Sequence, residues 1–190
     1  MADGTTDGGA LQRAVVDQLN RYEFYASLTQ DPSGTRWLDT GWDVDGGADE
    51  AWRWFVEPAL LARWSPMVPD RVLDFPGPAT VRENPGDDPV DAEVLVVDPS
   101  RRLIELRWGP STVRWWVRHI TDTESNIELR QSVADPQEAA MMAAGWAICL
   151  STLSALLSGH DVDRVVGADA LGYGWESIRD TYSRNFNADR

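Results

Sequence analysis

The sequence predicts an α+β fold in which a curved antiparallel β-sheet of about six to seven strands wraps around one long C-terminal α-helix, with two short helices after the first strand. Three observations predict it. Between residues 71 and 133, short apolar runs alternate with turn signals, which is typical of an antiparallel meander. Residues 137–157 form one apolar stretch with helical periodicity. The 190-residue chain has a single Cys, and a chain of this length builds its core without disulfides.

The chain divides into three predicted parts. Apolar residues at helical spacing predict an amphipathic helix over residues 10–28, which makes residues 1–30 an N-terminal helical arm. Residues 31–159 are predicted to form the main domain. Residues 160–190 are predicted to form a C-terminal extension with one short helix, and its Gly-rich part, 167–174, is interpreted as a flexible connector.

The main domain is predicted to begin with a strand and two short helices. Residues 35–45 alternate between apolar and polar side chains, and the two glycines that follow end the strand. Asp49 is placed to cap the next helix. Pro58 ends that helix, because a proline ring does not fit inside it, and residues 59–64 predict a second short helix.

Six more strands and the closing helix complete the domain. Turn signals such as Pro85-Gly86-Asp87-Asp88 and Gly109-Pro110-Ser111 separate the strands. The predicted strands are 71–75, 79–83, 90–97, 102–108, 112–120 and 126–133. Pro136 opens the helix 137–157 and Gly159 ends it. A sheet that grips a helix leaves a gap between the two, and an apolar pocket is expected in that gap.

Three stretches of the chain carry a resemblance to a known family. They are Ala48-Asp49-Glu50-Ala51-Trp52 with Phe55, Glu57-Pro58 and Arg63-Trp64; Glu93-Val94 through Asp98-Pro99-Ser100-Arg101-Arg102-Leu103; and Gly145-Trp146 with Leu150, Leu153 and Leu157. In these residues the chain resembles the helix-grip superfamily of START, birch-pollen-allergen and polyketide-cyclase-like (SRPBCC) domains, and within it the homologues of the heat-shock-protein ATPase activator. The resemblance spans about residues 35–158 and implies the helix-grip fold. It implies no single activity, because the superfamily contains lipid and hormone binders, aromatase/cyclases, co-chaperone modules and self-sacrificing resistance proteins.

Tryptophan dominates the candidate ligand-binding residues, with ten in the chain. Large aromatic rings stack on flat ligands, and alternation along the strands turns several of them toward the helix. The predicted ligand-binding residues are Trp64, Phe75, Trp108, Trp115, His119, Met142 and Trp146. Core packing is the alternative interpretation of these tryptophans, and it is favoured for Trp146, which matches a fold-bearing position of the resembling family.

The other face of the strands carries charges of both signs. The residues with this parity are Glu105, Arg107, Arg114, Trp116, Arg118, Glu128 and Arg130. A ladder of opposite charges on the convex side of the sheet is the favoured interpretation. If the register were displaced by one residue, Arg114 and Arg118 would instead line a pocket for a carboxylate or a phosphate.

Few residues are candidates for chemistry. His119 is the one ionisable residue predicted on the inward face, where it is a candidate acid or base; the alternative is a strand-end His bonded to the backbone. Cys149 lies on the apolar face of the long helix and is predicted to be inert. His160, Asp161 and Asp163 are interpreted as a polar turn, so no metal site is predicted. The chain has no phosphate-binding loop and no dinucleotide fingerprint, and no cofactor is predicted.

The net charge of −14 disfavours nucleic acid and anionic membranes as partners. The Trp-rich inward face without a catalytic constellation gives the leading hypothesis, a non-catalytic protein that binds a hydrophobic or aromatic small molecule between the sheet and the long helix. The alternatives are a polyketide cyclase/dehydratase-like enzyme that uses His119, and a co-chaperone-like or resistance/stress interaction module.

A single Cys and a polar start without signal-peptide features predict a cytoplasmic protein. Trp116 and the amphipathic arm leave a homodimer open.

Overall fold

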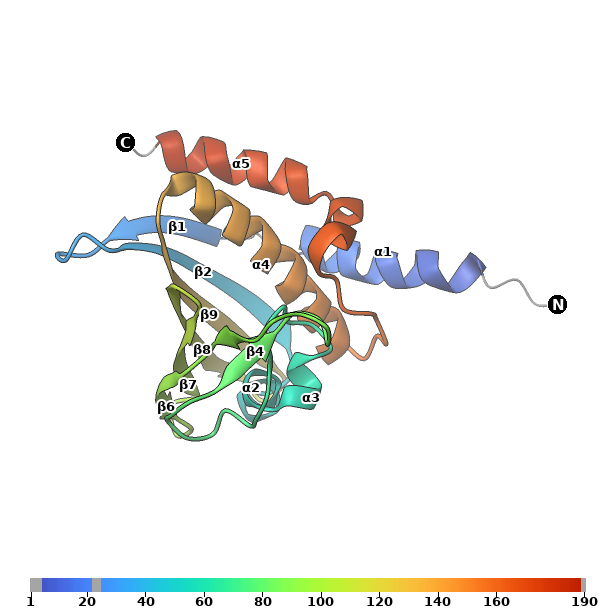
Figure 1. The fold of residues 1–190 in the computed structure, drawn as a ribbon. Helices are drawn as coiled ribbons and strands as arrows, with labels where there is room; N and C mark the ends of the chain where they lie inside the picture. The colour runs from blue at the N-terminus through green and yellow to red at the C-terminus, as the bar shows by residue number, and fades with distance from the viewer. Residues whose placement is uncertain (1–4, 22–24, 189–190) are drawn as a thin grey trace.

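The computed structural model describes residues 5–21 and 25–188 and has the predicted architecture, with a large antiparallel sheet curved around helix α4 (Pro136–Leu157) (Figure 1). The order of the six strands is β1-β2-β9-β8-β7-β6. Their bounds are β1 (Tyr25–Gln30), β2 (Arg36–Asp45), β6 (Val94–Asp98), β7 (Leu103–Trp108), β8 (Ser111–Thr121) and β9 (Glu124–Val133). The predicted helix-grip fold is confirmed.

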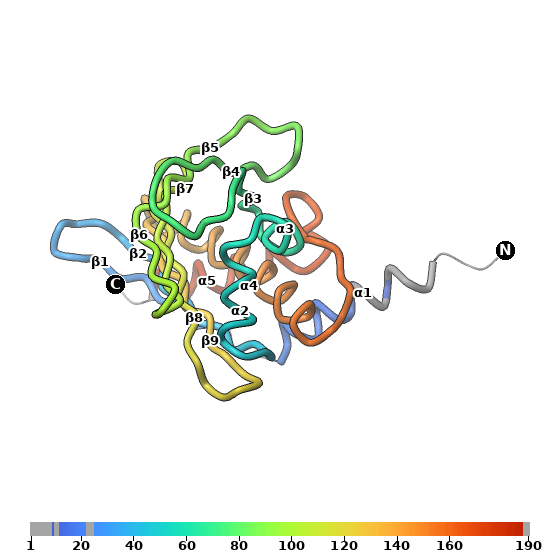
Figure 2. The backbone as a smooth tube through the Cα atoms, turned by 90° about the horizontal axis from the view of Figure 1, so that it is seen from below, coloured from blue at the N-terminus to red at the C-terminus, as the bar shows by residue number. Residues whose placement is uncertain are grey.

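The remaining elements surround this core. A second, small sheet has the order β3-β4-β5, with β3 (Val68–Pro69), β4 (Thr80–Arg82) and β5 (Val90–Asp91). The helices are α1 (Thr5–Arg21), α2 (Ala48–Val56), α3 (Pro58–Leu61), the 3-10 helix η1 (Gly167–Tyr173) and α5 (Trp175–Ala188). Both α1 and α5 pack against α4, and Figure 2 shows α1 on the side of α4 that faces away from the sheet. Helix α4 is therefore covered on both sides.

Helix α4 begins at a complete cap. The Asp135 side chain accepts hydrogen bonds from the backbone N–H groups of Gln137 (2.8 Å) and Glu138 (2.9 Å), and Glu138 accepts one from Ala134 N–H in return. The helix ends before Gly159, whose φ of +86° is the left-handed conformation typical of a helix terminus. Among the described residues, α4 is the one helix long and apolar enough to cross a membrane, but 78% of its most apolar stretch is buried inside the protein. It is the core helix of the fold.

Aromatic rings fill the space between the sheet and α4. The Trp115 ring centroid lies 4.8 Å from that of Trp146, 5.0 Å from that of Phe55 and 5.7 Å from that of Trp64. The Trp64 and Trp146 side chains are completely enclosed, and each indole N–H donates to a protein oxygen, Trp54 O at 3.0 Å and Gln131 Oε1 at 2.7 Å respectively. The central part of the predicted gap is thus a close-packed aromatic core.

The predicted helix over residues 10–28 is wrong at its C-terminal end. Helix α1 ends at Arg21, residues 22–24 lie outside the described residues, and β1 pairs along its whole length with β2. The Thr40 hydroxyl also donates to Tyr25 O at 2.6 Å. Pairing with the next strand, across the turn 31–35, therefore prevails over the local helical periodicity. The division at residue 30 into an arm and a main domain stays a prediction, although β1 lies in the main sheet.

Two of the predicted strands differ from the observed ones. The segment 71–75 is a loop, because the Arg71 guanidinium donates hydrogen bonds of 2.8–3.0 Å to four backbone carbonyls between residues 72 and 78. The segment 90–97 is two strands, β5 in the small sheet and β6 in the large one. The chain crosses between the sheets where Ala92 N–H donates to Ala79 O at 3.0 Å. In both segments, hydrogen bonds within the chain determine the backbone conformation, and the apolar pattern does not.

Three smaller predictions also need correction. Asp49 does not cap α2: the N-cap residue is Gly47, and Asp49 instead accepts a 2.7 Å hydrogen bond from Arg102 Nε. The helix predicted over 59–64 is the single turn α3. The segment 167–174, interpreted as a flexible connector, folds for most of its length into η1.

Candidate functional site

A cavity of about 280 Å³ lies between α4 and the segment 165–175 of the C-terminal extension. Most of its surface is apolar. Its walls are Met141, Met142, Gly145, Trp146, Ile148 and Cys149 of α4; Trp108 at the end of β7; Pro66 and Glu83; and Val165, Val166, Gly167, Ala170 and Trp175. It lies beside the aromatic core, and Trp146 belongs to both.

Gly145 creates the space on the α4 side. A Cβ atom built at this position meets no other atom within 4 Å, whereas its neighbours Ala144 and Trp146 are buried. Because Gly145 has no side chain, α4 continues as a regular helix and leaves open space in the cavity wall at this position. The Met142 thioether, one turn earlier, is half-buried at the same cavity.

Two indole rings form a corner of the cavity. The Trp108 and Trp146 centroids are 5.6 Å apart, and the ring planes meet at 58°. Trp146 is fixed by its hydrogen bond to Gln131, while Trp108 is only half-buried. The half-buried Trp108 ring therefore supplies the exposed aromatic surface of this corner, because Trp146 is almost fully buried.

The outer wall is held by polar links to the body of the protein. Arg164 donates to Ser65 O at 3.1 Å and to Glu83 O at 2.7 Å. Asp161 pairs with Arg63 at 2.6 Å. Val162 and Val165 are buried, so this segment is packed as well as hydrogen-bonded. This part of the C-terminal extension is therefore a fixed wall of the cavity.

Two ionisable groups, Glu83 and Cys149, line the cavity. Burial, together with the negative charge of Glu83, raises the pKa of the Cys149 thiol to about 12. The thiol is therefore uncharged at neutral pH and is a poor nucleophile, as predicted from its place on the apolar face.

Of the seven predicted ligand-binding residues, the structure brings Trp108, Met142 and Trp146 together at the cavity. Trp64 and Trp115 are buried in the aromatic core. The Phe75 side chain is 56% exposed in the Arg71 loop, with the guanidinium 4.2 Å from its ring centroid. The expected inward position of His119 is not found: the residue is exposed near the end of β8, beside a register shift, so parity did not bury it.

Sequence reasoning missed the part of the wall that comes from outside the resembling core. Residues 165–175 were assigned to a connector and a short helix, and Glu83 was the last residue of a predicted strand. Trp175 is a large aromatic residue directly after Gly174 and close to Gly172, and this was a usable sign of a built surface. Gly145 had no comparable sign, because a glycine inside a helix does not reveal what faces it.

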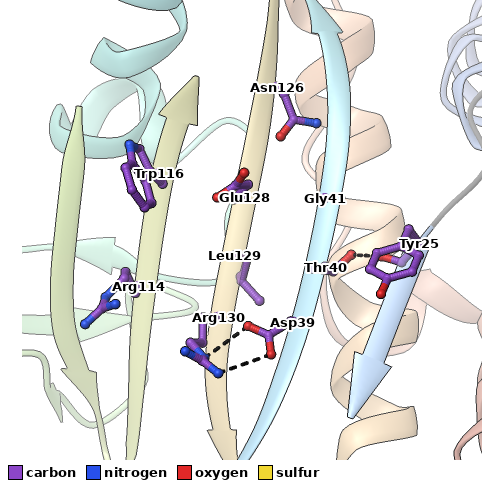
Figure 3. Close-up of a pocket in the computed structure, with 10 residues that line it drawn as sticks. All are labelled: Tyr25, Asp39, Thr40, Gly41, Arg114, Trp116, Asn126, Glu128, Leu129 and Arg130. Atoms are coloured by element: carbon purple, nitrogen blue, oxygen red, sulfur yellow. Dashed lines mark hydrogen bonds and ion pairs between the residues drawn. The ribbon is translucent and has the colours of Figure 1, made fainter. Parts of the chain in front are cut away.

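A second hollow, of about 350 Å³, lies on the outer face of the large sheet (Figure 3). Gly41 lies in it between Tyr25 and Glu128, its partners in the neighbouring strands. Its charged side chains are paired: Arg130 with Asp39 at 3.0 Å, Glu128 with Arg118 at 2.5 Å, and Arg114 with Glu105. The predicted charge ladder is therefore present, and the displaced register that would have turned Arg114 and Arg118 inward is wrong.

The ladder includes Trp116, whose ring centroid lies 3.5 Å from the Arg118 guanidinium carbon.

Within residues 5–21 and 25–188, no three His, Cys, Asp or Glu side chains are grouped closely enough to hold a metal ion. Of the two hollows described, the cavity beside α4 has the more apolar lining.

Comparison with solved structures extends the fold similarity beyond the main domain. A conserved protein of unknown function from Enterococcus faecalis, EF2215, matches with a TM-score of 0.67 at 12% identity, over 95% of this chain and 97% of its own. CalU16 from Micromonospora echinospora matches with a TM-score of 0.61 at 18% identity, over 87% and 96%. DynU16, a protein in the dynemicin biosynthetic locus, matches with a TM-score of 0.56 at 23% identity, over 65% of this chain and 47% of its own.

At these identities the solved structures show the fold alone, and no curated protein matches the sequence. The family comparison is more specific. Residues 46–158 match the Activator of Hsp90 ATPase homolog 1-like proteins, and this range contains the three stretches that carried the resemblance. The predicted relationship is confirmed, and the chain belongs to the family of Activator of Hsp90 ATPase homolog 1-like proteins.

Proposed function

We propose that this protein binds a small, largely apolar ligand with an aromatic group in the cavity between α4 and residues 165–175. The observation that carries the proposal is the open space above Gly145, bounded by Trp108, Met142 and Trp146. A cavity lined mostly by apolar and aromatic side chains, with few polar groups, is the usual form of a ligand site. We place this activity in the cytoplasm, where a free thiol such as Cys149 persists.

The volume limits the ligand. One water molecule takes about 30 Å³ of liquid, so a cavity of about 280 Å³ accommodates roughly ten non-hydrogen atoms. A single ring with a short substituent fits this size.

The enzyme alternative has less support. It relied on His119 as acid or base, and that side chain is exposed at the end of β8, away from the cavity. The interaction-module alternative relied on the sheet's convex face or on the terminal extensions. The residues of the C-terminal extension pack on α4 and form a wall of the cavity, which supports a role in ligand binding instead.

Native mass spectrometry of the gently purified protein, beside the same sample denatured, tests the proposal. We expect an added mass that is lost on denaturation. Gly145→Phe fills the cavity and should abolish that mass, while Gly145→Ala, which adds one methyl group, should retain it. Retention of the ligand by a folded Gly145→Phe protein would place the binding site elsewhere.

A further inference from the structure

Glu83 is the one charged residue among the described residues that line the cavity. Its backbone carbonyl accepts the hydrogen bond from Arg164, but its carboxylate accepts no hydrogen bond and forms no ion pair with any described residue. The side chain is half-buried. A carboxylate partly removed from water and left without a partner is unfavourable unless a cation or a donor joins it.

Three aromatic rings line the same small space, those of Trp108, Trp146 and Trp175. The face of an indole attracts a cation whose centre lies within about 6 Å of the ring. The Trp175 ring already has this kind of contact, since the Arg179 guanidinium carbon lies 5.0 Å from its centroid. Trp146 donates its N–H to Gln131, so that donor is not available to an anionic ligand.

No arginine is among the described residues that line the cavity, although the charge of Arg164 is close enough to act on the Cys149 thiol. Arg164 is engaged by Ser65 O and Glu83 O, and Arg179 pairs with Asp180 at 2.7 Å. An anion entering the cavity would therefore meet Glu83 without a lining cation. The net charge of −14 also favours the approach of cations to the protein.

We propose that the cavity selects an organic cation: a small ammonium ligand whose ring or alkyl body lies against Trp108 and Met142, and whose charge lies near Glu83 and the indole faces. This inference rests on the proposed function and specifies its ligand class. Glu83 and the three indole rings line the same cavity of about 280 Å³, and an indole face attracts a cation within about 6 Å of the ring.

The test compares two probes of equal size, 2-phenylethylamine, which is protonated at neutral pH, and the neutral 2-phenylethanol. Both are titrated calorimetrically into the wild-type protein, into Glu83→Gln and into Glu176→Gln. The last variant removes the same charge from an exposed position of α5 outside the cavity. We expect Glu83→Gln to weaken amine binding by about tenfold and to leave alcohol binding within about twofold. Glu176→Gln should change neither.

The remaining outcomes separate this inference from the proposed function. If Glu83→Gln weakens both probes equally, or weakens neither, the cation preference is overturned while the binding of the alcohol still supports an apolar ligand site. If the wild-type protein binds neither probe, the proposed function fails together with the inference. Alcohol binding to Glu83→Gln also reports that the variant keeps its cavity.

Discussion

At the scale of single residues, two glycines mark opposite environments. Gly145 faces the cavity, and an added Cβ meets nothing within 4 Å. Gly47, the N-cap of α2, lies against the β8–β9 turn, where an added Cβ would be 2.8 Å from Asp122 O. That atom is backbone, so it cannot move away cheaply.

Alanine substitutions at these two positions should therefore have opposite effects. Gly145→Ala is expected to raise the free energy of unfolding by about 1 kcal/mol, because alanine is the better helix former and finds room. Gly47→Ala is expected to lower it by about 1–3 kcal/mol through overpacking. Urea unfolding of both variants beside the wild type measures this. A destabilised Gly145→Ala protein would show that the position is not open.

Cys149 should be unreactive in the folded protein. Its pKa of about 12 leaves almost no thiolate at pH 8, and the thiolate is the reactive form. We expect iodoacetamide to leave the native protein unmodified at pH 8 and to alkylate it quickly in urea, as measured by intact mass. Rapid alkylation of the native chain would contradict the burial of this thiol.

At the scale of elements, the β1–β2 hairpin has its own electrostatic support. The Asp31 carboxylate accepts hydrogen bonds from Ser33 Oγ at 2.6 Å, Trp37 Nε1 at 3.0 Å and Thr35 N–H at 3.1 Å. The bonds from the Ser33 and Trp37 side chains are the main cause that lowers the Asp31 pKa from 3.8 to about 2. These donors stabilise the charged form.

The sign of the pH effect follows from the lowered pKa. Asp31 contributes to stability fully above its ordinary pKa of 3.8, and the contribution is lost as the pH falls through about 2. Asp31→Asn should remove the part of the stability that changes over this pH range. Carboxyl NMR titration of the wild type should give a midpoint near 2. A midpoint near 3.8 would mean that the hairpin turn is not formed as described.

The elements could be predicted where local pattern and long-range pairing agree. Strands β7, β8 and β9 and helix α4 follow from alternation, turn residues and the residues at their ends. The loop 71–75 could not be predicted, since the apolar pattern does not show that the Arg71 side chain binds four carbonyls of the segment 72–78. The strand β1 was not predicted because the apolar residues up to Tyr25 continue the helical spacing, although β2 follows directly after the turn 31–35.

At the scale of the whole molecule, the candidate site joins parts that are distant in sequence. Trp108, Met142 and Trp146 could be predicted from parity and helical spacing. The wall at 165–175 could not, because a segment without periodicity acquires its place through contacts such as the Arg164 hydrogen bonds. His119 shows the limit of strand alternation as a guide. Alternation predicts which face of the sheet a side chain lies on, but not whether another element covers the end of the strand.

Arg164 should control how firmly this wall is closed. Arg164→Ala removes the hydrogen bonds to Ser65 O and Glu83 O but keeps the buried Val162 and Val165. We expect a folded protein with faster hydrogen exchange over residues 160–175 and roughly tenfold faster ligand release. Hydrogen-exchange mass spectrometry measures the first and stopped flow the second.

Arg179→Ala is the matched control for Arg164→Ala, because Arg179 pairs with its chain neighbour Asp180 and should leave residues 160–167 unchanged. Unchanged exchange over the same residues in Arg164→Ala would mean that the packing of the valines alone holds the wall.

The row of rings from Phe55 through Trp64 and Trp115 to Trp146 and Trp108 has an optical consequence. Indoles whose centroids lie 4.8–5.7 Å apart couple their electronic transitions, and rigid rings in a chiral frame give strong near-ultraviolet circular dichroism. Since Trp146 and Trp108 also line the cavity, an occupant would perturb the end of this coupled chain. Filling of the cavity should therefore be visible spectroscopically, without any label.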